Sequence, residues 1–298
     1  MPAPAPAGGG TPRAVPFGVP ETVSDGATRT PAAALRPFVD RYRGYRLEGF
    51  PAGIHKGLPS RHLTFIISFD RPVELAAGPD GTEGGSYWAF VGGMHSQAAE
   101  IVHDGNQHGV SINVTPLGAR ALLGMPAGPL ASNVVNLDEL LGSTAVELSD
   151  RLAAARSWDA RFDILDEVLL RAANLDSPDP PPEVVQAWRR LVATGGAVEV
   201  GELAADVGWS RRHLSERFRE EVGLPPKVAA RVLRFERARN LLSLPTRPSL
   251  AAVAVACGYY DQAHFNREFT AMTGWTPTKW MAAELPSVQD VDAHNDGG

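Results

Sequence analysis

The side chains in this sequence best suited to chemistry lie together near residue 265. Four positions share one face of the helix predicted after Asp261: Gln262, Ala263, Asn266 and Arg267. Three of them are polar and suit hydrogen bonding to base edges, since arginine matches guanine O6 and N7 and side-chain amides match adenine N6 and N7. Phe265 and Phe269 are four residues apart, so they share another face and are expected to anchor the helix in a core.

The segment that positions these side chains spans residues 249–280 and predicts two helices joined by a tight turn. Gly258 is expected to end the first helix, because glycine enters the left-handed conformation at little cost. Asp261 then occupies an N-cap position. The remaining markers are a small apolar face before the turn and a closing glycine and proline: Val253, Ala254, Ala256, Gly274 and Pro277. This pattern is typical of a helix-turn-helix unit.

The same pattern occurs about fifty residues earlier in the chain. The matched positions are Leu203 and Ala204 with Val253 and Ala254, Gly208 with Gly258, Leu214 with Phe265, Phe218 with Phe269, Gly223 with Gly274, and Pro226 with Pro277. The offset is 50 before the turn and 51 after it, so the second unit has one extra residue in its turn. Ser210 takes the capping position of Asp261. The sequence therefore predicts two helix-turn-helix units.

A long helix is predicted between the two units, over residues 227–243. One face is apolar and the rest carries four arginines: Val228, Val232, Phe235, Ala238 and Leu242, then Arg231, Arg234, Arg237 and Arg239. Such a helix spans about 25 Å at roughly 1.5 Å per residue. Major-groove faces on one side of a duplex repeat about every 34 Å. The linker helix is therefore expected to hold two recognition helices in adjacent grooves.

The distribution of charge separates the end of the chain from the rest. The 298 residues carry a net charge of −6, yet residues 183–285 contain 14 Lys and Arg against 11 Asp and Glu. The remainder carries a net charge of −9. A length near 300 residues predicts two domains, and this asymmetry is typical of a DNA-binding domain joined to another domain. No apolar run is long enough for a membrane span, and the single cysteine suits a reducing cytoplasm.

The region before the two units predicts a β-rich domain. Residues 61–69, RHLTFIISF, form the best strand candidate, and residues 87–91 and 109–114 are further strands. Residues 35–137 are expected to form a small barrel or sandwich, and residues 32–45 a short helix leading to a strand. Residues 143–156 and 158–173 predict amphipathic helices, which form a dimerisation surface, a bridge to the next domain, or a pair packed on its own sheet.

Composition sets the domain boundaries. The Pro, Ala and Gly content of residues 1–31 predicts a disordered tail rather than a signal peptide. Residues 32–175 form the N-terminal domain, and the DSPDPPP segment over residues 176–182 is a proline-rich linker. Residues 183–285 form the C-terminal domain, and residues 286–298 are a second tail.

The C-terminal domain resembles the double helix-turn-helix domain of AraC-type (AraC/XylS family) transcriptional regulators. The resemblance rests on ACGYYDQAHFNREFTAMTGWTPTKW, on VGELAADVGWSRRHLSERFREEVGLPP and on the linker helix, and it covers residues 184–283. SRHLTFIIS and VTPLGARALLGMPAGPL resemble more loosely the N-terminal domains of one subgroup. The resemblance implies an α+β protein, with a mostly β, barrel-like (cupin-like) N-terminal domain with trailing helices and an all-α C-terminal domain.

The resemblance also implies a function and a set of site residues. The chain is expected to be a bacterial, cytoplasmic, sequence-specific transcription regulator that binds double-stranded DNA. The base-reading positions carried over are Arg212, Ser215, Glu216, Gln262, Ala263, Asn266 and Arg267, and the phosphate-contacting positions are Ser210, Arg211 and Lys279. Glu216 departs from the arginine common in relatives, so it either accepts a hydrogen bond from cytosine N4 or repels phosphate. A small-molecule effector, RNA polymerase and a homodimer are further partners that the resemblance allows.

Two other classes of function are alternatives to this one. Some relatives are alkyl-transfer repair enzymes, but these need a nucleophilic cysteine outside the helix-turn-helix units, and Cys257 lies inside one. The β region holds five histidines without the usual paired spacing of metal ligands: His55, His62, His95, His103 and His108. No catalytic residue, metal or cofactor is therefore expected. An interaction module that has lost DNA binding is the other alternative.

Overall fold

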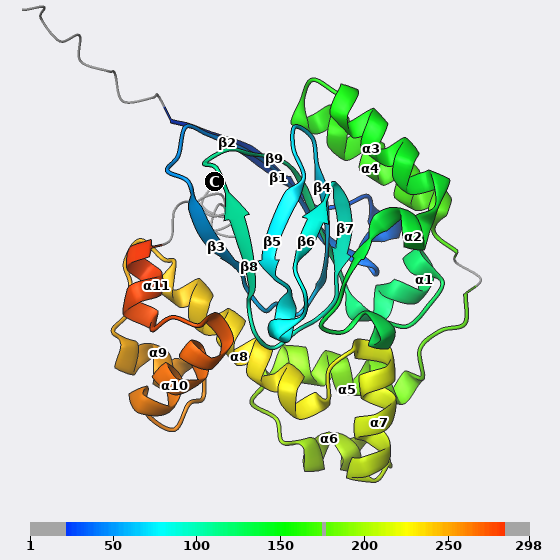
Figure 1. The fold of residues 1–298 in the computed structure, drawn as a ribbon. Helices are drawn as coiled ribbons and strands as arrows, with labels where there is room; N and C mark the ends of the chain where they lie inside the picture. The colour runs from blue at the N-terminus through cyan, green and yellow to red at the C-terminus, as the bar shows by residue number, and fades with distance from the viewer. Residues whose placement is uncertain (1–21, 175–176, 284–298) are drawn as a thin grey trace, which may run out of the picture.

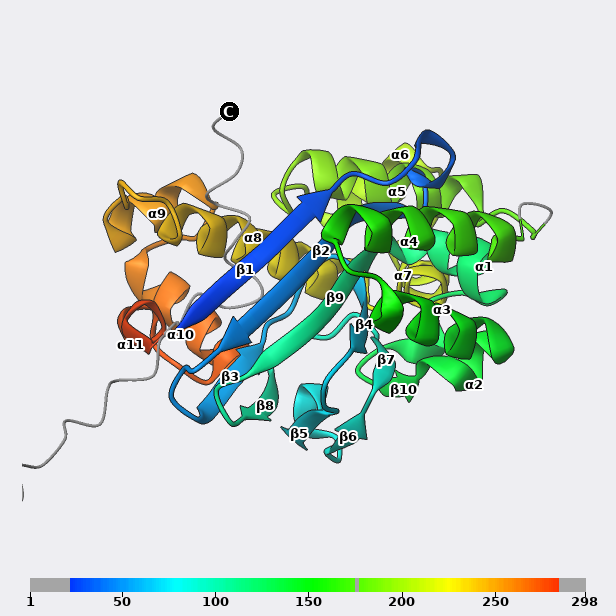
Figure 2. The ribbon, with the colours of Figure 1, turned by 90° about the horizontal axis from the view of Figure 1, so that it is seen from above.

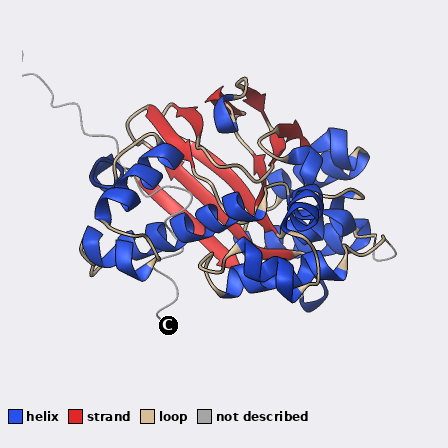
Figure 3. Ribbon diagram, turned by 90° about the horizontal axis from the view of Figure 1, so that it is seen from below, coloured by secondary structure: helices blue, strands red, loops and turns tan. Residues whose placement is uncertain are grey.

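The computed structural model describes residues 22–174 and 177–283, and these form a β-rich part followed by a helical part (Figure 1). The predicted α+β architecture is confirmed. Helices and strands are largely segregated, with two groups of helices beside the strands (Figure 3). The predicted tail over residues 1–21 and the tail after residue 285 lie outside the described residues.

The β-rich part contains two antiparallel sheets. The first has the order β1-β2-β9-β4-β7-β10, with the bounds Val23–Arg29, Val39–Glu48, Gln107–Val114, Leu63–Ser68, Ala89–Gly92 and Val134–Asn136. The second has the order β3-β8-β5-β6, with the bounds Gly53–Gly57, Ala99–His103, Val73–Ala77 and Gly85–Tyr87. Buried and half-buried residues alternate along β4, as expected for a strand with one face in a core.

Two of the sequence predictions for this part need correction. Residues 23–29 were assigned to the disordered tail but form β1, because they pair with β2 over seven residues. This edge strand has no long apolar run that composition would reveal. Residues 87–91 do not form one strand, because the chain leaves β6 at Tyr87 and enters β7 of the other sheet at Ala89.

The N-terminal part also contains α-helices and short 3₁₀ helices. They are α1 (Ala119–Leu123), α2 (Leu137–Leu141), α3 (Ser143–Ala154) and α4 (Trp158–Ala172), with short 3₁₀ helices at Ala33–Leu35, Pro79–Gly81, Pro116–Gly118 and Gly128–Leu130. Figure 2 shows α3 and α4 lying along the strands. Leu148 of α3 and Phe162 of α4 share a core with Phe65 of β4. The packing of this helix pair on its own sheet, one of the alternatives given above, is therefore confirmed.

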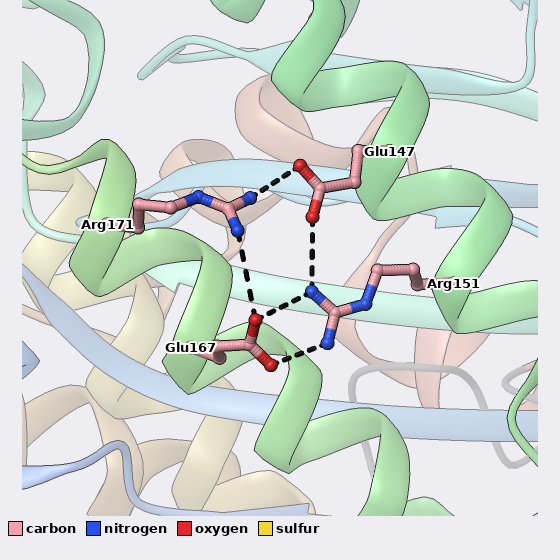
Figure 4. A network of polar contacts seen from close by, with 4 residues as sticks. All are labelled: Glu147, Arg151, Glu167 and Arg171. Atoms are coloured by element: carbon pink, nitrogen blue, oxygen red, sulfur yellow. Dashed lines mark hydrogen bonds and ion pairs between the residues drawn. The ribbon is translucent and has the colours of Figure 1, made fainter.

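The outer surface of this helix pair carries a network of four charged side chains (Figure 4). Arg151 of α3 contacts Glu167 of α4 at 2.5 Å, and Arg171 of α4 contacts Glu147 of α3 at 2.5 Å. Hydrogen bonds from Arg171 and Arg151 hold the pKa of Glu147 below its usual range, and the hydrogen bond from Arg151 does the same to the pKa of Glu167. Because Glu167 and Arg171 are exposed and Glu147 and Arg151 are only half-buried, solvent screens the network, and it is expected to add little to the stability of the fold.

The helical part consists of seven helices in the described range 177–283. Their bounds are α5 Pro182–Ala193, α6 Val200–Asp206, α7 Arg211–Val222, α8 Pro226–Leu242, α9 Leu250–Ala256, α10 Gln262–Thr273 and α11 Pro277–Ala283. The predicted pair of units is confirmed as α6 with α7 and α9 with α10, joined by the predicted linker helix α8. None of the helices in the described ranges combines the length and apolarity needed to cross a bilayer.

Candidate nucleic-acid interface

The second helix-turn-helix unit is built as its sequence predicts. Gly258 has φ 74°, in the left-handed region. The side chain of Asp261 accepts a hydrogen bond of 2.6 Å from the backbone N–H of His264, which caps α10. Phe265 and Phe269 are fully buried. Of the small apolar face predicted on α9, Val253 and Ala254 are buried, but Ala256 is exposed.

The residues predicted to read bases in this unit lie on one exposed surface of α10. Gln262, Ala263 and Arg267 are exposed, and Asn266 is half-buried. The Oδ1 atom of Asn266 is buried and has no hydrogen-bond partner among the described residues. Gln262 and Ala263 in the first turn of the capped helix and Arg267 a turn later thus face solvent together, which is the arrangement that a recognition helix needs to enter a major groove.

The first unit has the same local geometry. Gly208 has φ 71°, and the Ser210 side chain accepts a hydrogen bond of 3.2 Å from the N–H of His213. Leu214 and Phe218 are fully buried. Trp209 is half-buried, and its ring lies edge-on to the ring of His213, with 4.5 Å between the ring centres.

The predicted reading face of α7 differs from that of α10 in its charge. Arg212 and Glu216 are exposed, Ser215 is half-buried, and the Nε atom of Arg212 donates to Glu216 Oε1 at 2.9 Å. This hydrogen bond raises the pKa of Arg212 further. The two residues are four apart on one helix, so the contact is the common i,i+4 pair. The carboxylate of Glu216 therefore pairs with the guanidinium of Arg212, which would otherwise be available to contact DNA.

Replacing Glu216 by Gln is expected to strengthen DNA binding. The substitution removes a negative charge from the reading face and releases Arg212 from its ion pair. Affinity should rise by roughly threefold to tenfold at low salt, and the salt dependence of binding should steepen by about one phosphate contact. Fluorescence anisotropy with labelled duplex over a range of salt concentrations measures both. Glu220→Gln, on the same helix but paired with Arg217, is the matched control, and weaker binding by Glu216→Gln would instead make Glu216 a reader of cytosine.

The three residues predicted to contact phosphates lie at the edges of these faces. Ser210, Arg211 and Lys279 are all exposed. The guanidinium of Arg211 lies over α6, where it would be 2.5 Å from a side chain added at Gly201. The ammonium of Lys279 lies 5.1 Å from the centre of the Trp275 ring. Both cations are therefore placed by neighbouring groups and remain open to solvent.

Two exposed residues beside α10 were missed in the sequence. Tyr260 is 92% exposed and Val255 is 78% exposed. Tyr260 occupies the turn that carries the extra residue of the second unit, and Tyr259 beside it is buried. The one-residue insertion in this turn is the sequence feature that could have indicated an exposed Tyr260, because an added residue in a tight turn either packs inward or points outward. An exposed ring next to a reading face suits contact with a sugar or a thymine methyl.

The linker helix α8 does more than separate the units. Its predicted apolar residues Val232, Phe235, Ala238 and Leu242 are buried, and Val228 is half-buried. Two of its arginines bind α10, since Arg231 donates to Glu268 at 2.7 Å and Arg234 lies 3.7 Å from the same carboxylate. These arginines were predicted only to populate the outer face. They fix the second recognition helix against the linker.

A second feature of the molecule is a cavity of about 460 Å³ between the two sheets. Its lining includes polar residues of β2, β9 and β4, apolar residues of β8 and β5, and two residues of α8: Arg43, Ser111, Thr64, Ile101, Leu75, Glu236 and Arg239. Cavities of this size are typical of small-molecule sites. The N-terminal domain thus has a pocket that reaches the linker helix of the C-terminal domain.

Four of the five histidines noted in the sequence line this cavity: His55, His62, His95 and His103. Burial lowers the pKa of all four, and that of His55 falls to about 4, so these rings are neutral near pH 7. The ring centres of His55 and His103 lie 5.7 Å apart, and the ring of His108 forms a hydrogen bond with the carboxylate of Asp70. Within residues 22–174 and 177–283, no three metal-ligating side chains come together.

Comparison with known proteins agrees with this geometry. Residues 203–283 match a family described as "Helix-turn-helix domain", and the fold and exposed faces define the same class. The chain is 34% identical over 89 residues to an HTH-type transcriptional regulator of Mycobacterium tuberculosis, covering 30% of this chain and 34% of that protein. It is 32% identical over 93 residues to the arabinose operon regulatory protein of Escherichia coli, covering 31% and 32%. The C-terminal part of the chain thus contains a helix-turn-helix domain, similar in sequence to the corresponding part of the arabinose operon regulatory protein.

These matches span about a third of the length of the curated relatives. The whole fold is similar to a crystal structure of unsaturated fatty acid-bound wild-type ToxT from Vibrio cholerae, with a TM-score of 0.52. That likeness covers 87% of this chain and 99% of the other at 10% identity. It therefore supports the arrangement of a β-rich part before a helical part, and it concerns the fold alone.

Proposed function

We propose that this protein is a sequence-specific transcription regulator that places α7 and α10 in adjacent major grooves of double-stranded DNA. The observation that carries the proposal is the pair of capped helices with exposed N-terminal faces, in a domain of AraC type. Recognition helices contact base edges through such N-terminal residues. The protein is expected to act in the cytoplasm.

The proposed contacts follow from the exposed side chains. Gln262, Asn266 and Arg267 read bases in one groove, with Ala263 close enough to meet a thymine methyl. Arg212, Ser215 and Glu216 face the other groove. Ser210, Arg211 and Lys279 contact phosphates, which fix the orientation of the domain but carry no sequence information.

Arg267→Ala tests the proposal at one base pair. The guanidinium is exposed at the reading face, so its loss should cost about 1–3 kcal/mol on the preferred site and relax specificity at one position. Selection of bound sequences from a random duplex library, followed by anisotropy titrations, measures both quantities. Arg247→Ala, in the exposed loop between α8 and α9, is the matched control. Equal weakening on every sequence would make Arg267 a phosphate contact, and a folded wild-type protein that selects no sequence would support the interaction-module alternative.

We further propose that the N-terminal domain senses a small-molecule effector in the cavity between the sheets. The lining combines apolar walls with buried polar groups such as Arg43, which is 6% exposed, and Ser111, which is 8% exposed. ToxT, which shares the fold, was crystallised with an unsaturated fatty acid. A thermal-shift screen of small organic molecules tests this part, and it fails if no compound stabilises wild type more than a variant with tryptophan at Ser111. RNA polymerase and a second copy of the chain are proposed as further partners.

A further inference from the structure

The two recognition helices contact the N-terminal domain at equivalent positions of the repeat. The carbonyl of Glu221 in α7 accepts a hydrogen bond of 3.3 Å from the N–H of Ala127, and the carbonyl of Met272 in α10 accepts one of 2.7 Å from the N–H of Ala98. Glu221 and Met272 are 51 residues apart, which is the repeat offset after the turn. The last turn of each recognition helix therefore makes the contact with the N-terminal domain.

The first of these docking contacts is tight and buried. Arg120 of α1 binds the carboxylate of Glu221 through two hydrogen bonds, of 2.8 Å and 2.7 Å, and Glu221 is only 1% exposed. A side chain at Gly128 would lie 2.5 Å from the Glu220 carbonyl. Glycine is thus required at this approach, and the end of α7 is held from two sides.

The second docking contact involves a cation and a ring. The ammonium of Lys56 in β3 lies 5.4 Å from the centre of the Trp275 ring, just after α10, and pairs with Glu100 of β8. Leu58 and Met94 of the N-terminal domain are buried in the core of the helical domain. The N-terminal domain therefore contacts both helix-turn-helix units through polar interactions and a shared apolar core.

The docked ends are opposite the reading ends. Arg212 and Gln262 lie in the first turn of α7 and α10, whereas Glu221 and Met272 lie in the last turn. The first-turn residues are exposed while both helices are docked. Docking therefore leaves the proposed DNA surface open, and it fixes the position of one recognition helix relative to the other, with α8 between them (Figure 1).

We propose that the N-terminal domain sets the spacing of the two DNA contacts, and that Arg120 and Lys56 are positioning residues for DNA binding. This inference rests on the proposed function. The linker helix packs on both units within one core, but on its own it leaves the last turns of α7 and α10 without a common support. Docking of both helix ends on one body supplies that support, so the protein accepts a single separation of the two sequences that α7 and α10 contact.

The test compares operators that differ in spacing. The preferred duplex is first selected from a random library with the full-length wild type. One base pair is then inserted between the sequence that α7 contacts and the sequence that α10 contacts. The insertion shifts one contact by about 3.4 Å and rotates it by about 35°. Wild type is expected to lose at least tenfold in affinity. Arg120→Ala, Lys56→Ala and the double variant are expected to lose less, with the double variant losing threefold or less.

The control is Arg29→Ala, which removes an arginine that binds Asp163 and Asp166 within the N-terminal domain and should keep the wild-type response to the insertion. Lys56→Ala alone decides the matter if Arg120→Ala does not fold. The same fold-loss on insertion in wild type and in the positioning variants would overturn the inference, as would a wild type that tolerates the insertion. Failure of wild type to select any sequence would instead overturn the proposed function.

Discussion

Replacing Phe269 by alanine should destabilise the C-terminal domain by about 3–5 kcal/mol, the usual cost of removing a buried phenylalanine. Phe269 is fully buried, and its ring lies 5.2 Å from that of Phe235 and 5.6 Å from those of Phe265 and Trp280. It thus joins the linker helix, the recognition helix and α11. Denaturant unfolding followed by tryptophan fluorescence measures the loss.

The same substitution separates folding from recognition. Because Phe269 faces the core and not the proposed DNA surface, weaker DNA binding should appear only under conditions where the second unit unfolds. Tyr260→Ala is the matched control, since its ring is 92% exposed and its loss should change stability by less than about 0.5 kcal/mol. A loss of less than 1 kcal/mol in Phe269→Ala would contradict the packing described here.

The helix-turn-helix units could be predicted because their determinants are local. A turn glycine, an N-cap residue and two anchors four residues apart lie close together in the chain, within residues 208–218 in the first unit and 258–269 in the second. The i,i+4 spacing of Arg212 and Glu216 is equally local, whereas the hydrogen bond between their side chains is seen only in the structure. The strand at Leu63–Ser68 was predicted from its β-branched and aromatic residues.

The features that escaped prediction depend on contacts between distant residues. β1 is a strand only because β2 pairs with it, and its own sequence, VSDGATR, has weak strand character. The cavity combines residues of both sheets with Glu236 of α8, and no periodicity in one segment reveals such a site. Likewise Arg120 and Glu221 are 101 residues apart. Each looks like an ordinary surface charge in its own helix.

That ion pair leads to the second large effect. Arg120→Ala leaves the carboxylate of Glu221 buried without its guanidinium, and removing one member of a buried pair costs about 3–5 kcal/mol. The expected loss is nearer 3 kcal/mol, because the Arg120 side chain is 22% exposed and water can reach part of the site. Urea unfolding of the full-length protein measures this loss in the free energy of unfolding, with a signal that follows the separation of α7 from the N-terminal domain.

A double substitution distinguishes the cost of a stranded charge from the loss of attraction. Arg120→Met combined with Glu221→Leu removes both charges and keeps side chains of similar length, so it should recover stability to within about 1 kcal/mol of wild type. If the double variant is as unstable as Arg120→Ala, the ion pair itself holds α7 on the N-terminal domain. If it recovers, packing around Gly128 and Val222 holds the helix, and the charges determine which alignment of the two surfaces is tolerated, since a shifted interface would bury each charge without its partner.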